Sequence, residues 1–167
     1  MTSFVILLGG DLMVTARLRQ QIRGARAIAA DSGMMHASAL GLVPELWVGD
    51  FDSAGSELAI QYAEVPREIF AVEKDATDGA IAVATAIARG ALPIVLAGGL
   101  GGQADHTAGL LGQALQIARG GRSCLVTSGA DVDDAVWAIA HGMAKVHAAA
   151  PTSEEMAATA SVAALRA

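Results

Sequence analysis

The stretch "ELWVGDFDS" at residues 45–53 runs from a short apolar segment straight into two aspartates, Asp50 and Asp52. The apolar segment is short and bounded by polar residues, as a buried strand is. Two carboxylates this close repel each other if both are ionised and dry. Water, a bound Mg²⁺ or a basic neighbour therefore has to neutralise them. The rest of the sequence indicates which of these three applies.

Similar apolar runs recur on both sides of this stretch and alternate with longer segments whose apolar residues have helical spacing. The expected strands cover residues 4–10, 25–31, 45–51, 68–74, 93–99 and 123–129. The expected helical segments lie between them, at residues 12–24, 34–41, 56–64, 78–90 and 105–121. This alternation predicts an α/β fold: a three-layer, doubly wound, mostly parallel sheet of about six strands with helices on both faces.

Composition limits the classes of partner. The chain has 167 residues, enough for one domain with a real core, and a net charge of −6. That charge argues against a general nucleic-acid or anionic-membrane binder, which needs clustered Lys and Arg. One cysteine, Cys124, excludes an internal disulfide framework and favours a reducing compartment. The run "FVILLGG" is too short to span a membrane, so we expect a soluble, cytoplasmic protein.

A polar or glycine-rich loop follows each expected strand. Because the carboxyl ends of parallel strands share one edge of a sheet, these loops should converge there. We therefore expect six carboxylates at one rim: Asp31, Asp50, Asp52, Asp75, Asp78 and Asp105. So many acidic groups need a cation, and oxygen-only ligands favour Mg²⁺ over Zn²⁺. Because Mg²⁺ usually shares its ligands with substrate phosphates, the pattern points to a nucleotide polyphosphate.

Each of these loops also has a simpler interpretation. Asp52 or Ser53 could cap the helix that follows, and Thr77 or Asp78 could cap the helix at 78–90. Asp105 could likewise be only an N-cap. The glycine pairs at 98–99 and 101–102 would let backbone N–H groups approach a phosphate, but no G-x-x-x-x-G-K-[ST] motif is present. We interpret His36 and Trp47 as structural residues.

Four motifs in order carry a family resemblance: "ADSG" (30–33), "GLVPELWVGDFDS" (41–53), "EKDATD" (73–78) and "GGLGGQADHT" (98–107). Over about residues 6–128 the chain resembles the catalytic domain of thiamine pyrophosphokinases. The resemblance implies Mg²⁺-dependent transfer of pyrophosphate from ATP to thiamine, which gives thiamine diphosphate and AMP. It also implies a transferase (a kinase of thiamine diphosphate biosynthesis) with ATP and thiamine as partners and a homodimer as a possible assembly.

The resemblance also assigns residues. Asp50, Asp52 and Asp78 would hold Mg²⁺, and the catalytic set would be Asp50, Asp52, Asp78 and Asp105. Whether Asp78 or Asp105 takes the thiamine hydroxyl proton stays open. The expected ATP- and phosphate-binding residues are Asp31, Ser32, Gly33, Lys74, Asp75, Thr77, Gly99, Gly101, Gly102, Gln103 and His106.

Three positions depart from the family pattern: Ser32 replaces a usual Gly, Gln103 a usual Arg, and Leu110 a usual Asn. Loss of the Arg removes a positive charge and a bidentate phosphate donor. The family also carries a C-terminal β-rich domain that supplies much of the thiamine pocket, whereas the sequence after residue 130 is Ala-rich and lacks strand alternation.

We therefore expect a nucleotide-binding catalytic domain at 1–130 and a helical or partly disordered segment at 131–167, with a helix over 132–147. Two alternatives to an active thiamine pyrophosphokinase stay open. One is a truncated Mg·ATP-binding module without turnover, and the other is a pyrophosphokinase for another alcohol, such as a pterin.

Overall fold

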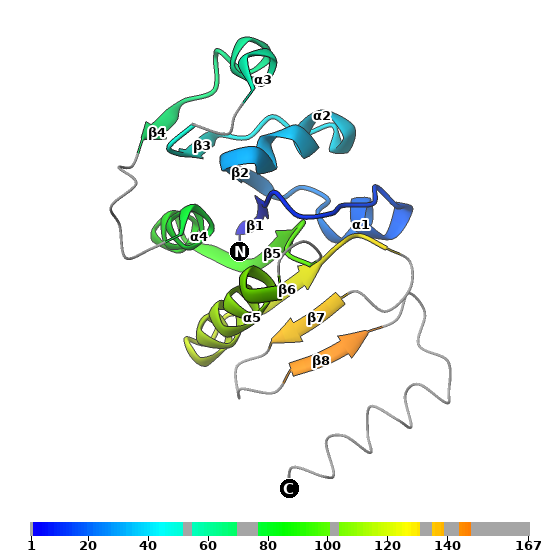
Figure 1. Cartoon of the computed structure of the whole chain (residues 1–167). Helices are drawn as coiled ribbons and strands as arrows, with labels where there is room; N and C mark the ends of the chain where they lie inside the picture. Colours follow the sequence, from blue (N-terminus) through cyan, green and yellow to red (C-terminus); the bar gives the residue numbers. More distant parts are fainter. Residues whose placement is uncertain are drawn as a thin grey trace, which may run out of the picture.

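One sheet organises the molecule (Figure 1). The computed structural model describes residues 2–51, 55–69, 77–100, 104–130, 135–138 and 144–147. Within these ranges eight strands pair in the order β4-β3-β2-β1-β5-β6-β7-β8. Their bounds are β1 (Thr2–Leu7), β2 (Arg26–Ala30), β3 (Leu46–Gly49), β4 (Arg67–Ile69), β5 (Ala91–Ala97), β6 (Cys124–Thr127), β7 (Ala135–Ala138) and β8 (Ala144–His147). The strands from β4 to β6 pair in parallel, as the sequence predicts, and β7 and β8 pair antiparallel.

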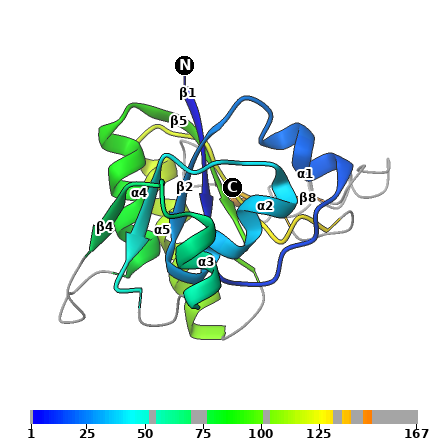
Figure 2. The same cartoon turned by 90° about the horizontal axis from the view of Figure 1, so that it is seen from above.

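Helices cover both faces of the sheet (Figures 1 and 2). They are α1 (Ala16–Gln21), α2 (Ala37–Leu40), α3 (Ser56–Gln61), α4 (Asp78–Ala88) and α5 (Ala104–Arg119), and a 3₁₀ segment, η1 (Asp31–His36), precedes α2. None of the helices in the described ranges combines the length and apolar character that crossing a bilayer requires.

Period-two alternation along β1 divides the core between the two faces. Phe4 and Ile6 pack in one apolar cluster with α4 and α5. Val5 and Leu7 point the other way, into a cluster with α1, η1 and α2. The predicted three-layer arrangement is therefore confirmed, and each face of the central strand is buried under helices.

Residues 135–138 and 144–147 depart from the helix predicted over 132–147. The described parts of this region are the strands β7 and β8, which extend the sheet beyond β6, with Cys124 opposite Ala138 and Thr127 opposite Ala135. The helix prediction is wrong because it rested on local Ala content. Pairing with the free edge of β6 instead gives the backbone groups hydrogen-bond partners, and such tertiary pairing overrides intrinsic propensity. The domain boundary after residue 130 stays a prediction.

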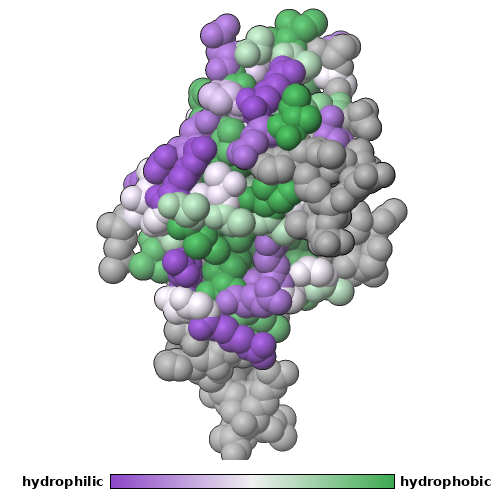
Figure 3. Space-filling view, turned by 90° about the vertical axis from the view of Figure 1, so that its left-hand side faces the viewer, coloured by the Kyte–Doolittle hydropathy of each residue, from purple (hydrophilic) through white to green (hydrophobic). Residues whose placement is uncertain are grey.

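The edge strand β4 is short and charged. Arg67, Glu68 and Ile69 are all exposed, and hydrophilic and hydrophobic side chains are interspersed on the side of the molecule that carries β4 and α4 (Figure 3). The sequence predicts a strand over 68–74, whose residues beyond 69 lie outside the described ranges. Two charges on a three-residue edge discourage pairing with a further strand.

The strand order reverses between β1 and β5. The chain proceeds from β1 outward to β4, then returns to the other side of β1 and proceeds outward through β5 and β6. In open parallel sheets, ligands bind outside the carboxyl ends of the strands at such a reversal. This point of the fold is where the candidate site should be sought.

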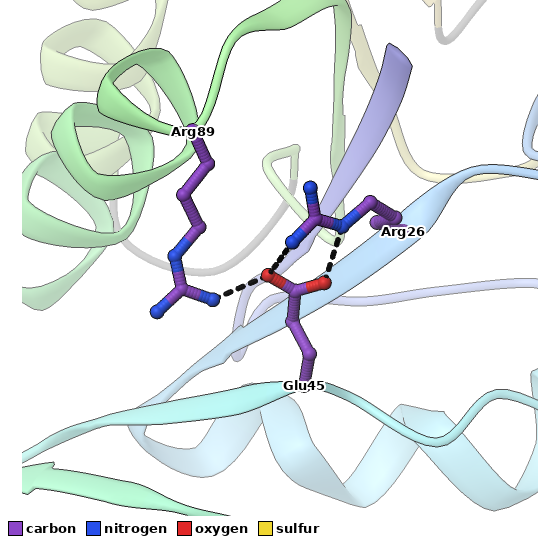
Figure 4. A network of polar contacts seen from close by, with 3 residues as sticks. All are labelled: Arg26, Glu45 and Arg89. Carbon is purple, nitrogen blue, oxygen red and sulfur yellow. Dashed lines mark hydrogen bonds and ion pairs between the residues drawn. The ribbon is translucent and has the colours of Figure 1, made fainter.

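The C-terminal end of α4 is linked to the start of the sheet strands β2 and β3 by three charged residues (Figure 4). Glu45, just before β3, accepts hydrogen bonds from Arg26 Nε at 2.5 Å and Arg26 Nη2 at 2.7 Å, and also from Arg89 at the C-terminal end of α4. Burial alone would raise the pKa of Glu45. The hydrogen bonds and charges of the two arginines outweigh burial and lower that pKa.

Candidate functional site

The loops after β1 and β5 are joined at the strand-order reversal. Leu8 N donates to Ala97 O at 2.8 Å, and Gly10 N donates to Gly98 O at 3.0 Å. Gly98 has a φ of +75°, and a Cβ there would lie 2.4 Å from Leu8 O. Only glycine therefore fits where the two loops cross, and their backbones form one continuous edge.

The loop after β2 packs against the same edge. A Cβ on Gly33 would lie 2.1 Å from Leu7 O, the carbonyl that ends β1. A Cβ on Gly9 would lie 2.2 Å from Ser32 Oγ. The predicted residues Ser32 and Gly33 thus stand directly beside the carboxyl end of the central strand, in the segment η1.

Asp31 and Asp50 belong to adjacent loops of this edge. Asp31 begins η1, Asp50 follows β3 directly, and a Cβ on Gly49 would lie 3.2 Å from Asp31 Cα. Trp47 Nε1 donates to Asp31 O at 2.9 Å, which ties β3 to the start of η1. The structure therefore brings the two predicted carboxylate positions to one part of the rim.

The N-terminal end of α4 adds Asp78 to the same edge. Thr77 is the N-cap, and its hydroxyl accepts a hydrogen bond from Ala80 N at 3.2 Å. A Cβ on Gly79 would lie 3.0 Å from the side chain of Leu8, just past β1. The capping interpretation is confirmed for Thr77, while Asp78 lies in the first turn of the helix, where a negative charge is favourable.

The structure tests the simpler interpretation of two other predicted residues, Gly99 and Asp105. Gly99 is buried, and a Cβ there would lie 2.8 Å from Val126 Cγ1, so packing accounts for the glycine. Asp105 lies inside α5, which begins at Ala104, so the idea that Asp105 caps this helix is wrong.

The remaining predicted residues lie outside the described part of the structure. Nothing is described of the side chains of Asp105 and His106 or of the residues Asp52, Lys74, Asp75, Gly101, Gly102 and Gln103. Among the residues that the structure does describe, no three His, Cys, Asp or Glu side chains form a group that could hold a metal ion. The set of Asp50, Asp52 and Asp78 therefore stays a prediction, because Asp52 belongs to the undescribed part.

The donor chemistry of the rim nevertheless fits Mg²⁺ and a nucleotide phosphate. Of the predicted metal ligands, Asp50 and Asp78 belong to the described part of the chain, and both are carboxylates, which are hard oxygen donors. Close packing at the buried glycines Gly33 and Gly98 leaves no room for side chains where the loops after β1, β2 and β5 meet.

Sequence reasoning missed two contacts at this edge. His36 Nε2 lies 3.0 Å from Gly10 O and joins η1 to the loop after β1. Trp47 is fully buried, as expected of a core residue, but its indole N–H also holds the Asp31 backbone. A buried tryptophan needs a partner for its N–H, and that requirement was the available signal.

Cys124 takes no part in the candidate site. It is fully buried in β6, and burial raises the pKa of its thiol to about 12. The thiol therefore stays protonated near neutral pH and acts as a small apolar residue, as the sequence suggests.

Several known proteins are similar to this chain. The family model described as "Thiamin pyrophosphokinase, catalytic domain" matches residues 20–125. The thiamine pyrophosphokinase structure from Bacillus subtilis is similar with a TM-score of 0.65 at 23% identity, over 75% of this chain and 60% of that chain. The one from Geobacillus thermodenitrificans has a TM-score of 0.61 at 27% identity, over 76% of this chain and 59% of that chain.

More distant structures share the fold. The yeast thiamin pyrophosphokinase is similar with a TM-score of 0.59 at 14% identity, over 75% of this chain and 58% of that chain. The chain spans about 60% of the length of the Bacillus subtilis structure. No curated protein sequence matches it. Because the family match covers more than half of its residues, the chain belongs to the thiamine pyrophosphokinase family through that family's catalytic domain.

Proposed function

We propose that this chain binds Mg·ATP at the carboxyl edge of its sheet and transfers pyrophosphate from ATP to thiamine. What supports the proposal is that Asp31, Asp50 and Asp78 belong to three segments, η1, the loop after β3 and the start of α4, that reach the edge where the strand order reverses. Membership of the family supports the choice of substrates.

In this reaction the hydroxyl oxygen of thiamine attacks the β-phosphorus of ATP. The bond between that phosphorus and the oxygen bridging to the α-phosphorus breaks, and AMP leaves with the electron pair. The hydroxyl proton passes to a base, for which Asp78 and Asp105 are the candidates. Transfer of this kind depends mainly on positioning and on neutralising phosphate charge, which a bound Mg²⁺ supplies.

The residues of the chain contribute through placement. Asp50 and Asp78 would hold the cation from two sides of the edge, on a strand terminus and on the first turn of an 11-residue helix. That helix also points its N-terminal backbone N–H groups and the positive end of its dipole at the rim. A polyphosphate at this edge would therefore meet both metal-bound carboxylates and favourable backbone dipoles.

A Mg·ATP-binding module without turnover is the second candidate. The observation that favours it is Gln103, which stands where the family pattern has an arginine that would bring a positive charge to the ATP phosphates. A thiamine site completed across a homodimer likewise stays a proposal. The cytoplasmic location likewise stays a prediction.

One assay separates these functions. The chain is incubated with ATP and Mg²⁺, with thiamine, with a pterin alcohol or with neither acceptor, and AMP and the diphosphorylated product are measured. ATP binding is measured in parallel by calorimetry. Thiamine-dependent AMP release supports the enzyme, whereas ATP binding without AMP supports the module. AMP released only with the pterin alcohol identifies a different acceptor, and no binding of Mg·ATP refutes the proposal.

A further inference from the structure

Two non-glycine residues in the described ranges have a positive φ, and both lie at the candidate site. Asp31 has a φ of +44° and Phe51, which follows Asp50, has a φ of +64°. A residue with a Cβ is strained in this region, and a bulky aromatic residue more so. Such conformations persist only where surrounding contacts hold them.

Trp47 contacts both strained residues. Its Nε1 donates to Asp31 O at 2.9 Å. Its ring meets the Phe51 ring edge-on, with centroids 4.9 Å apart and an interplanar angle of 85°. Trp47 has no exposed surface, so its ring cannot turn away without repacking the core.

Arg67 holds the same aromatic pair from the edge strand β4. Its guanidinium carbon lies 5.0 Å from the Trp47 ring centroid and 5.5 Å from that of Phe51. The guanidinium also donates to Ala59 O in α3 at 2.7 Å. A cation over both rings restricts their movement, and its bond to α3 fixes the cation in turn.

We propose that Trp47 is a positioning residue for Asp31 and Asp50, two carboxylates of the proposed Mg·ATP site. Trp47 holds Asp31 and Phe51, the residue after Asp50, in strained backbone conformations. These conformations set the orientation of the Asp31 and Asp50 side chains. Trp47 touches neither nucleotide nor cation in this scheme. The inference rests on the proposed function, because the carboxylates are positioned to bind Mg·ATP.

The test compares Trp47→Phe and Trp47→Leu with the unaltered chain. Phenylalanine keeps a ring against Phe51 and Arg67 but removes the hydrogen bond to Asp31, and leucine removes both contacts. Ile22→Val is the control, because Ile22, the C-cap residue of α1, lies in the same apolar cluster as Trp47 and the change removes only a methylene. ATP affinity is measured by calorimetry with Mg²⁺ and with EDTA.

We expect Trp47→Phe to weaken Mg·ATP binding about tenfold, as loss of a contact that orients metal ligands typically does, and Trp47→Leu to weaken it further. Affinity for ATP in EDTA should stay unchanged in both variants. Amide hydrogen exchange should rise in peptides covering residues 31–36 and 46–51 and stay unchanged in β5. The Ile22→Val variant should bind Mg·ATP like the unaltered chain.

Three results would overturn the proposal. The first is unchanged Mg·ATP affinity in Trp47→Leu, and the second is an equal loss of affinity with Mg²⁺ and with EDTA. The third is unchanged hydrogen exchange at residues 31–36 in both variants. If the unaltered chain binds no Mg·ATP, the proposed function fails. The positioning role then stands only if exchange at 31–36 still rises and Mn²⁺ alone binds the unaltered chain more tightly than Trp47→Phe.

Discussion

Replacing Gly33 by alanine should destabilise the protein and disturb its rim at the same time. The added methyl would lie 2.1 Å from Leu7 O and 2.5 Å from Leu7 C, where ordinary contacts begin at 3.4 Å. Both obstructing atoms belong to the backbone of the central strand, which is hydrogen-bonded on both sides. The strand cannot move without breaking its ladders, so η1 must shift instead.

Overpacking of this kind costs roughly 1–3 kcal/mol and sometimes more, and the obstruction by backbone places Gly33→Ala at about 3 kcal/mol. For a protein of this size, that loss lowers the melting temperature by about 6–12 °C. Because η1 begins at Asp31, its shift should also weaken Mg·ATP binding. Thermal unfolding followed by circular dichroism and calorimetric titration measure the two effects.

The same chemical change provides its own control in α5. Gly109 and Gly112 are exposed helical positions where an added Cβ meets nothing within 4 Å. Alanine at either should stabilise the protein by roughly 0.5–1 kcal/mol, because glycine is a poor helix former. A Gly33→Ala protein that melts within a degree of the unaltered chain would refute the close-packing argument at this edge.

Four further predictions follow from the site and its supports. Asp50→Asn and Asp78→Asn should each weaken Mg²⁺-dependent ATP binding with little change in thermal stability; two variants that bind normally would remove both residues from the metal site. Because the folded-state pKa of Glu45 is lowered, its stabilising effect should be present above the ordinary carboxyl range and disappear as pH falls through that pKa. At pH 7, the free energy of unfolding of Glu45→Gln should therefore be about 1 kcal/mol below that of the unaltered chain, a figure that allows for the partial exposure of the two arginines. Unfolding measured at successively lower pH should show this difference disappear. Native Cys124 should resist thiol reagents at pH 8 and react only in denaturant, and rapid native labelling would contradict its burial. Gln103→Arg should raise affinity for the ATP phosphates, and equal titration curves would place this residue away from them.

Much of the fold follows from local pattern. The apolar runs at β1, β5 and β6 predict buried strands, and their alternation with helical segments predicts a parallel sheet. The convergence of Asp31 and Asp50 at one edge then follows from the geometry of parallel sheets alone. The strands could be predicted because each depends on residues close together in the sequence, and the convergence could be predicted because parallel sheets have a regular geometry.

Other features depend on contacts between distant residues, which a single sequence does not contain. The bond from Trp47 to Asp31 spans sixteen positions and is decided by the packing of β3 against η1. The strands β7 and β8 lie in an Ala-rich region that favours helix, and only the free edge of β6 turns them into strands. For Thr77 the sequence allows both helix capping and phosphate binding, and the start of α4 at Asp78 places Thr77 at the N-cap.

The ion cluster of Arg26, Glu45 and Arg89 has a consequence for the rim at the other end of α4. With 11 residues, α4 is about 16 Å long. Because the ion cluster holds the C-terminal end of this rigid helix, it also limits the movement of Asp78 at the N-terminal end. The position of Asp78 thus depends partly on charges on the far side of the molecule, and natural variation in those charges would alter the proposed site without changing any of its residues.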